Sequence, residues 1–172
     1  MKSTLAYLFL VTIMVYFKSE EKLLGDHKAG YVQIGMQADE LYGYYEHNSL
    51  ELFDQFLEAT FSPAFNIKNE HGMVELVAEL NCNTIWRIKV VSPDYKTKEG
   101  IHIGSTLGEL KEYFSFEEVL RGEGNIVVYS KEKDLSFLLD VYQMEELGVD
   151  LNGRIELADI PNEVRVAAIL VL

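Results

Sequence analysis

Residues 95–110 read YKTKEGIHIGSTLGEL, and they mark the point where one half of the chain ends and a second half with the same plan begins. Gly100 and Gly104 are predicted to bracket a short strand and to allow a tight turn into a helix, which a residue with a Cβ would hinder. The segment lacks the Gly-Lys-Ser/Thr ending of a phosphate-binding loop. Its predicted role is therefore architectural.

The two halves show a weak internal repeat at two offsets. At an offset of 69 residues the matching pairs are Val32 with Ile101, Ile34 with Ile103, Gly35 with Gly104, Glu40 with Glu109 and Leu41 with Leu110. At an offset of 81 the pairs are Ile85 with Val166, Ile88 with Ile169 and Val90 with Val171. The economical interpretation is a duplicated unit, and chance similarity of two halves is the alternative.

Alternating and helical hydrophobic patterns predict the elements of each half. The first half has a strand at 30–35, a helix at 36–46 and strands at 64–68, 73–80 and 84–91. The second has a helix from 105 or 106 to about 114 and strands at 125–130, 135–141 and 164–171. Residues 48–61 fit either a helix or a strand, and this alternative stays open. We therefore predict an α+β fold in which two tandem strand-helix-antiparallel-meander units, 30–92 and 99–172, form one compact body.

The N-terminal residues 1–19 have the pattern of a secretory signal peptide. Lys2 supplies a positive charge, and an almost unbroken apolar run follows from Leu5 to Phe17. A clear small-x-small cleavage site is missing, so an uncleaved anchor is a second interpretation and a buried first element is a third. We expect an exported protein of the periplasm or cell envelope that touches the membrane only through this segment, if at all.

The net charge of −13 limits the kinds of partner. It repels nucleic acid and anionic lipid surfaces and attracts a basic protein, which is the partner class we expect. Dispersed acidic residues also serve solubility, and this plainer explanation accounts for most of the charge.

The sequence lacks the residue patterns of an enzyme. The histidines His27, His47, His71 and His102 are scattered singly, which predicts no metal site. The single cysteine, Cys82, lies in a predicted turn, and there is no Gly-x-Ser-x-Gly nucleophile motif. We therefore expect a protein without catalytic activity and without a cofactor.

Four aromatic residues are the candidate binding residues: Tyr42, Tyr44, Tyr45 and Trp86. Three tyrosines within four positions cannot share one helix face, so at least one should reach the surface, where tyrosine is a favoured recognition residue. The alternative for the tyrosines is packing of the helix on a sheet, and the alternative for Trp86 is a place in the core.

Three stretches carry a resemblance to known proteins: residues 95–110, residues 122–129 (GEGNIVVY) and residues 135–140 (LSFLLD). From Gly30 to the C-terminus the chain resembles a group of uncharacterised small exported proteins of Bacteroidetes-type bacteria. More remotely, it is similar to the small envelope domains of outer-membrane-assembly lipoproteins and to the tandem beta-lactamase-inhibitor protein. It lacks the lipid-anchor cysteine of the former and the disulfides of the latter, so no residue roles are transferred.

The leading functional hypothesis from these features is a non-enzymatic binding or interaction protein of the cell envelope. The alternative is a periplasmic immunity or inhibitor protein against a basic toxin or enzyme. A glycan hydrolase is a third hypothesis, and it requires two carboxylates about 5 to 10 Å apart in a groove.

Overall fold

The structure is a computed structural model that describes residues 22–57, 60–122, 124–130 and 134–172. The predicted signal peptide or anchor at 1–19 lies outside these residues. No helix among the described residues is long and apolar enough to span a membrane.

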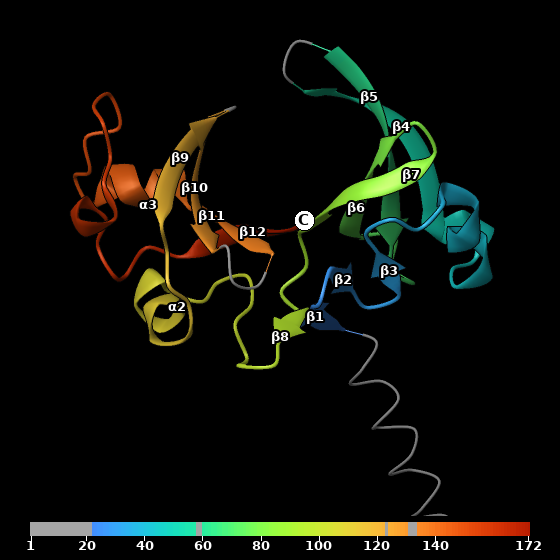
Figure 1. Cartoon of the computed structure of the whole chain (residues 1–172), viewed down its shortest axis with the longest axis horizontal. Helices are drawn as coiled ribbons and strands as arrows, with labels where there is room; N and C mark the ends of the chain where they lie inside the picture. Colours follow the sequence, from blue (N-terminus) through green and yellow to red (C-terminus); the bar gives the residue numbers. More distant parts are fainter. Residues whose placement is uncertain (1–21, 58–59, 123, 131–133) are drawn as a thin grey trace, which may run out of the picture.

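A large antiparallel sheet of eight strands dominates the molecule (Figure 1). Its spatial order is β4-β5-β6-β7-β12-β11-β10-β9, so two four-strand meanders meet where β7 pairs with β12. The strands are β4 (Leu50–Leu57), β5 (Thr60–Lys68), β6 (Val74–Asn81), β7 (Thr84–Val90), β9 (Glu118–Gly122), β10 (Asn125–Ser130), β11 (Leu135–Leu139) and β12 (Val166–Val171).

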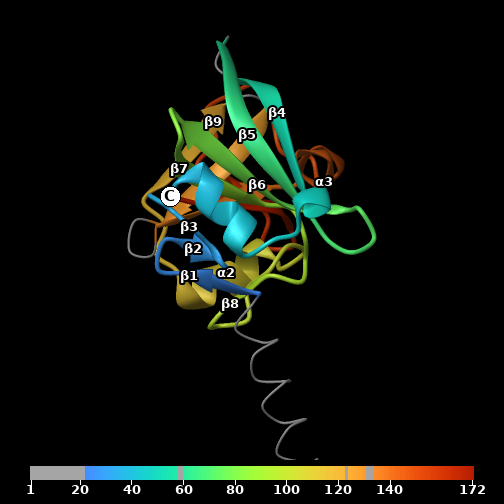
Figure 2. The same cartoon turned by 90° about the vertical axis from the view of Figure 1, so that its right-hand side faces the viewer.

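A small second sheet has the order β3-β2-β1-β8. Its strands are β1 (Leu23–Gly25), β2 (Lys28–Ala29), β3 (Val32–Gln33) and β8 (Lys96–Thr97), and β8 pairs in parallel with β1. Figures 1 and 2 both place this sheet at the end of the molecule opposite the β4–β5 hairpin. The short helices are η1 (Ala38–Gly43), η2 (His47–Ser49), α2 (Leu107–Tyr113), α3 (Val141–Glu146) and η4 (Leu157–Asp159).

The predicted α+β class is wrong, because the described residues are rich in β-structure and form only short helices. The predicted helix at 36–46 is reduced to the six-residue 3-10 helix η1. Glycine and aromatic residues are weak helix formers, and the N–H groups of Tyr44 and Tyr45 both donate to the Leu41 carbonyl, which ends η1. The predicted strand between Gly100 and Gly104 does not form either.

Two further strands complete the correction. The open alternative at 48–61 is resolved as strand for most of its described residues: η2 ends at Ser49, β4 follows, and β5 begins at Thr60. Every residue of β4 pairs with β5. The edge strand β9 was not predicted at all. Val119 is the one residue of the five in β9 whose apolar side chain packs against the core. The segment therefore lacks the alternation of apolar and polar residues that predicts a strand.

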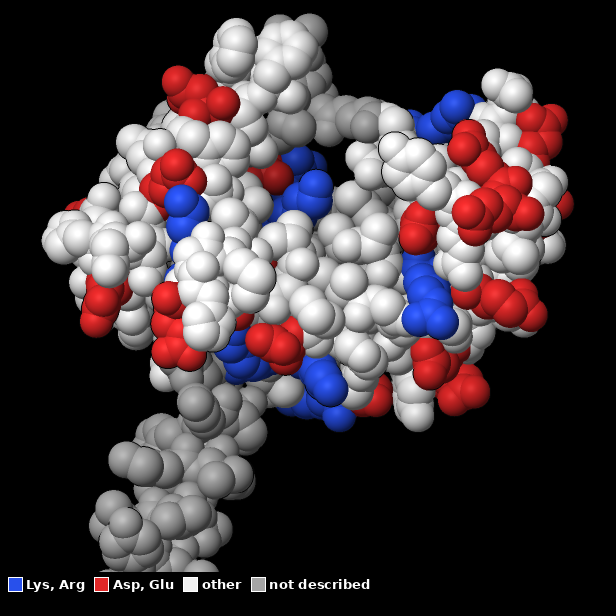
Figure 3. All heavy atoms as spheres, turned by 180° about the vertical axis from the view of Figure 1, so that it is seen from behind, with Lys and Arg blue, Asp and Glu red and all other residues white. Residues whose placement is uncertain are grey.

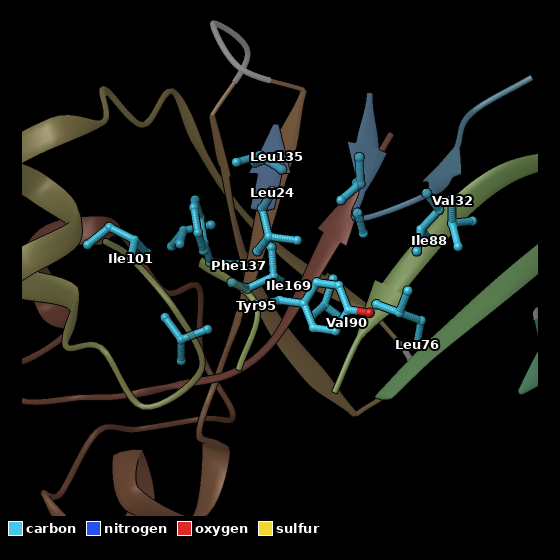
Figure 4. Close-up of a cluster of buried hydrophobic side chains, with 14 of the residues drawn as sticks. Leu24, Val32, Leu76, Ile88, Val90, Tyr95, Ile101, Leu135, Phe137 and Ile169 are labelled. Carbon is cyan, nitrogen blue, oxygen red and sulfur yellow. The ribbon is translucent and has the colours of Figure 1, made fainter. Parts of the chain in front are cut away.

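One face of the large sheet carries the hydrophobic core. Directly paired residues point to the same face of an antiparallel sheet, so the strand register defines rows of side chains. One such row crosses all eight strands and is apolar throughout: Leu50, Ile67, Leu76, Val90, Ile169, Phe137, Val128 and Val119. The small sheet and helices pack on this row, with Leu24, Val32 and Tyr95 among the buried partners (Figure 4). Both predicted units therefore share one core.

The two halves attach their helices to the sheet through equivalent hydrogen bonds. The Gly35 N–H donates to the Ile85 carbonyl at 2.7 Å, and the Gly104 N–H donates to the Val166 carbonyl at 2.9 Å. Both glycines have positive φ angles, 87° and 95°, which favour glycine. The two donors, Gly35 and Gly104, are 69 residues apart, and the two acceptors, Ile85 and Val166, are 81 residues apart. These are the two offsets of the internal sequence repeat. The duplication itself stays a prediction about the origin of the chain.

Candidate functional site

The second face of the large sheet is concave and forms a groove. Figure 1 shows that the sheet curves so that its two meanders face each other. Side chains from both meanders line a hollow of about 560 Å³. The row of directly paired residues across this face is mixed in character: Glu51, Asn66, Val77, Lys89, Leu170, Ser136, Tyr129 and Glu118. We call this hollow the groove.

The two sides of the groove differ in chemistry. The side built by β9 to β12 carries the aliphatic side chains of the hollow, Leu120, Val127, Leu138, Leu170 and Leu172, and polar residues such as Glu118, Asn125 and Ser136 lie among them. The side built by β4, β6 and β7 is polar and includes Gln55, Glu79, Arg87 and Lys89. Apolar surface on one side and charged groups on the other are the two elements of an amphipathic binding site.

A buried ion pair forms the polar side of the groove. Glu79 on β6 and Arg87 on β7 are directly paired, and Nε and Nη2 of Arg87 lie 2.8 and 2.7 Å from Oε2 of Glu79. The Glu79 side chain is only 3% exposed. Burial raises the pKa of its carboxyl, although the Arg87 guanidinium acts in the opposite direction.

Gln55 adds a polar group beside this pair. Its side chain is close enough to Glu79 to help lower the pKa of the carboxyl. Its amide nitrogen, however, is buried and makes no hydrogen bond of acceptable geometry to the described residues. An unsatisfied buried donor is costly, and the Glu79 carboxylate is the acceptor that lies beside it.

Lys89 is the second cation of the groove, and its environment differs from that of Arg87. Its side chain is half-buried, and no described carboxylate oxygen lies within 4.0 Å of its Nζ. The two carboxylates of the same row, Glu51 and Glu118, lie three and four strands away on the edge strands β4 and β9. Figure 3 shows basic side chains inside the hollow and acidic side chains spread over both flanks. The groove is therefore less acidic than the protein as a whole.

The predicted tyrosines lie away from the groove. Tyr42 packs against Phe65 with ring centroids 6.2 Å apart, and Phe65 belongs to the core-facing side of β5. Tyr44 stacks on Tyr31 at 5.4 Å, and Tyr45 is partly buried against the core. The three side chains thus pack η1 and its neighbours onto the sheet, while Tyr42 and Tyr44 keep about half of their surface exposed.

Trp86 is separate from the tyrosines. It is the extra residue at a β-bulge between β6 and β7, and 43% of its surface is exposed. The Arg87 guanidinium lies 4.6 Å from its ring centroid. Trp86 does not line the groove itself, but it contacts a residue that does. The structure therefore does not bring the four predicted residues into one site.

Sequence reasoning missed the groove residues, although one signal was present. In β7, Arg87 and Lys89 alternate with Ile88 and Val90, which indicates one polar face. The apolar residues of β10 to β12 gave no such signal, because these strands carry apolar side chains on both faces. Only the strand order shows that these residues lie opposite the charged ones.

Comparisons with known proteins establish a shared fold and nothing more specific. No family model matches the chain, and no curated protein matches it. Among solved structures, the chain is similar to the crystal structure of the uncharacterized protein yfeY from Escherichia coli, with a TM-score of 0.55 and 13% sequence identity. The match covers 87% of this chain and 95% of that one. At this identity the similarity concerns the fold alone.

Proposed function

We propose that the protein is a non-enzymatic binding protein of the cell envelope and that the groove is its binding site. The single observation that carries the proposal is the concave face of the large sheet, where a sheet of eight strands leaves leucine side chains and Lys89 facing an open hollow. A volume of about 560 Å³ falls within the range of small-molecule sites. The export signal predicted at residues 1–19 supports an envelope location.

An immunity or inhibitor protein against a basic toxin is the second candidate. The net charge of −13 and the acidic flanks seen in Figure 3 favour it. A basic partner would meet repulsion at Arg87 and Lys89, so it would bind the outer flanks rather than the groove. The two candidates therefore predict different binding surfaces.

Site-specific photocrosslinking separates these surfaces. Tyr129 lines the groove, and Tyr113 is exposed on α2 outside it. Each is replaced in turn by p-benzoylphenylalanine, which resembles tyrosine in shape, and the protein is irradiated in envelope extract. The proposal predicts a mass-defined adduct, protein or small molecule, at position 129 and none at position 113. Adducts at 113 alone would favour a flank, and no adduct at either position would contradict both candidates.

A further inference from the structure

We infer that the ligand of the groove is an amphipathic anion of the fatty-acid type, with an aliphatic chain on the β9–β12 side and an anionic head at Lys89. This inference rests on the proposed binding function. It goes further by assigning the chemical class of the ligand and the residues that hold each part of it.

The apolar side of the groove provides a continuous track for an aliphatic chain. Four apolar residues form one row on the groove face, because each is directly paired with the next on the neighbouring strand. From β12 through β11 and β10 to β9 they are Ala168, Leu138, Val127 and Leu120. Three interstrand steps of about 4.8 Å make this row roughly 14 Å long. Leu120 at its far end is 43% exposed, and Leu138, Val127 and Leu120 line the hollow. This surface is long, narrow and apolar, as an alkyl chain requires.

The head group position follows from the charges. Lys89 is directly paired with Leu170, at the boundary between the polar and apolar sides. Three cations line the hollow. Arg87 is bound to Glu79, and Arg121 donates to the Leu151 carbonyl and is paired with Ile126 of the core face. Lys89 is therefore the cation of the groove face with no described carboxylate within 4.0 Å. A half-buried ammonium group beside an apolar row is stabilised by an anion that brings its own apolar chain.

The acidic charge of the whole protein does not oppose this assignment. At physiological ionic strength, exposed charges more than about 8 Å apart are largely screened from one another. The flanking carboxylates act through water, whereas Lys89 acts directly on a head group inside the groove. A flat anionic membrane would still be repelled by the flanks, so the inference concerns a single extracted amphiphile and not a lipid surface.

The first experiment measures binding of palmitate to the purified protein, below the concentration at which palmitate aggregates. Equilibrium dialysis gives the affinity directly, and the fluorescence of Trp86, the only tryptophan, reports changes at its neighbour Arg87. Decanoate, whose extended chain is about two methylenes shorter than the apolar row, should bind roughly 15-fold more weakly because each buried methylene contributes about fourfold. Palmitoyl glycerol tests the need for charge, and lysophosphatidate distinguishes a phosphate head from a carboxylate head.

Matched variants locate the ligand. Lys89→Met keeps the aliphatic stem and removes the charge, and it should weaken palmitate binding about tenfold. Its control, Lys96→Met, changes an exposed lysine of the small sheet. Leu120→Asn should weaken binding roughly tenfold, whereas Leu52→Asn, an equally polar change at an exposed leucine on the other face of β4, should leave binding unchanged.

The outcomes distinguish the ligand class from the binding function. Tight palmitate binding that Lys89→Met and Leu120→Asn both weaken supports the inference. Equal binding of palmitoyl glycerol and palmitate would refute the anionic head, and equal binding of decanoate and palmitate would refute the aliphatic track. Absence of palmitate and lysophosphatidate binding, together with a protein adduct at position 129, would overturn the inference and leave the proposed groove function intact. Absence of both would overturn both.

Discussion

Replacement of Arg87 by methionine tests the electrostatics of the groove. The substitution keeps most of the aliphatic stem but removes the only described ion-pair partner of Glu79, whose side chain is 3% exposed. Loss of one partner from a buried ion pair typically costs 3 to 5 kcal/mol, because the remaining charge is left uncompensated. Arg87 itself is 22% exposed, so water reaches the pair and we expect the lower limit, about 3 kcal/mol at pH 7.

The cost of Arg87→Met should depend on pH in a defined direction. Burial already raises the pKa of Glu79 above its ordinary value of 4.5, and loss of Arg87 raises it further. A carboxyl with a raised folded-state pKa contributes stability that is fully present below its unfolded pKa and is lost as the pH rises through the folded pKa. The variant should therefore approach the wild type near pH 4 and fall behind it as the pH rises toward 7.

Urea unfolding monitored by circular dichroism measures these differences without adding ions that screen the pair. A loss of about 3 kcal/mol at pH 7 corresponds to a decrease of about 6 to 12 °C in the thermal midpoint for a chain of this size. The double variant Arg87→Met/Glu79→Gln removes the uncompensated charge and should recover about half of the loss. A destabilisation that is the same at pH 4 and pH 7, or that the second substitution leaves unchanged, would refute this account of the groove.

Three further predictions concern the scaffold. Gly104→Ala should lower the free energy of unfolding by about 1 to 2 kcal/mol, because φ of Gly104 is 95°. The control is Gly43→Ala, measured in the same urea assay. Gly43 also has open space at its Cβ position but no positive φ, so this substitution should have little effect. Thr106→Ala removes the acceptor for the Glu109 N–H at 3.2 Å and should cost about 1 kcal/mol, with Ser115→Ala as the control for loss of an exposed hydroxyl. Tyr44→Ala removes the stack on Tyr31 and should lower the free energy of unfolding by about 1 kcal/mol. Palmitate affinity in equilibrium dialysis should be unchanged. Reduced affinity in a stably folded variant would make the tyrosines candidate binding residues again.

Local sequence patterns predicted most central strands but not the class of the fold. The predicted strands at 64–68, 73–80 and 125–130 overlap β5, β6 and β10, because these segments alternate in hydrophobicity and end at turn residues. The helices were overestimated. Acidic residues near Asp39 indicated a helix start correctly, but that signal gives no information on helix length, which η1 limits to six residues.

The sequence correctly predicted that some of the tyrosines are exposed, but it did not predict which face of the large sheet they lie on. Tyr42 and Tyr44 do reach the surface, yet Phe65 and Tyr31 hold their rings on the side of the sheet that carries the core. A sequence shows that three tyrosines cannot share one helix face. It does not show which face of the large sheet η1 covers. That face depends on contacts such as the hydrogen bond from the Gly35 N–H to the carbonyl of Ile85 in β7, fifty residues further along the chain.

The groove exists only through long-range strand order. Within one strand, Lys89 is a lysine between two buried apolar residues, and Leu170 is one of several apolar residues in an apolar strand. Their pairing across β7 and β12 joins the side of the groove that carries Arg87 and Lys89 to the side that carries its leucines. Because the two meanders follow the same order and meet at their last strands, each contributes the same face to the concavity. Similar halves with different side chains therefore produce a groove with two chemically distinct sides, and this asymmetry gives a bound ligand a single orientation.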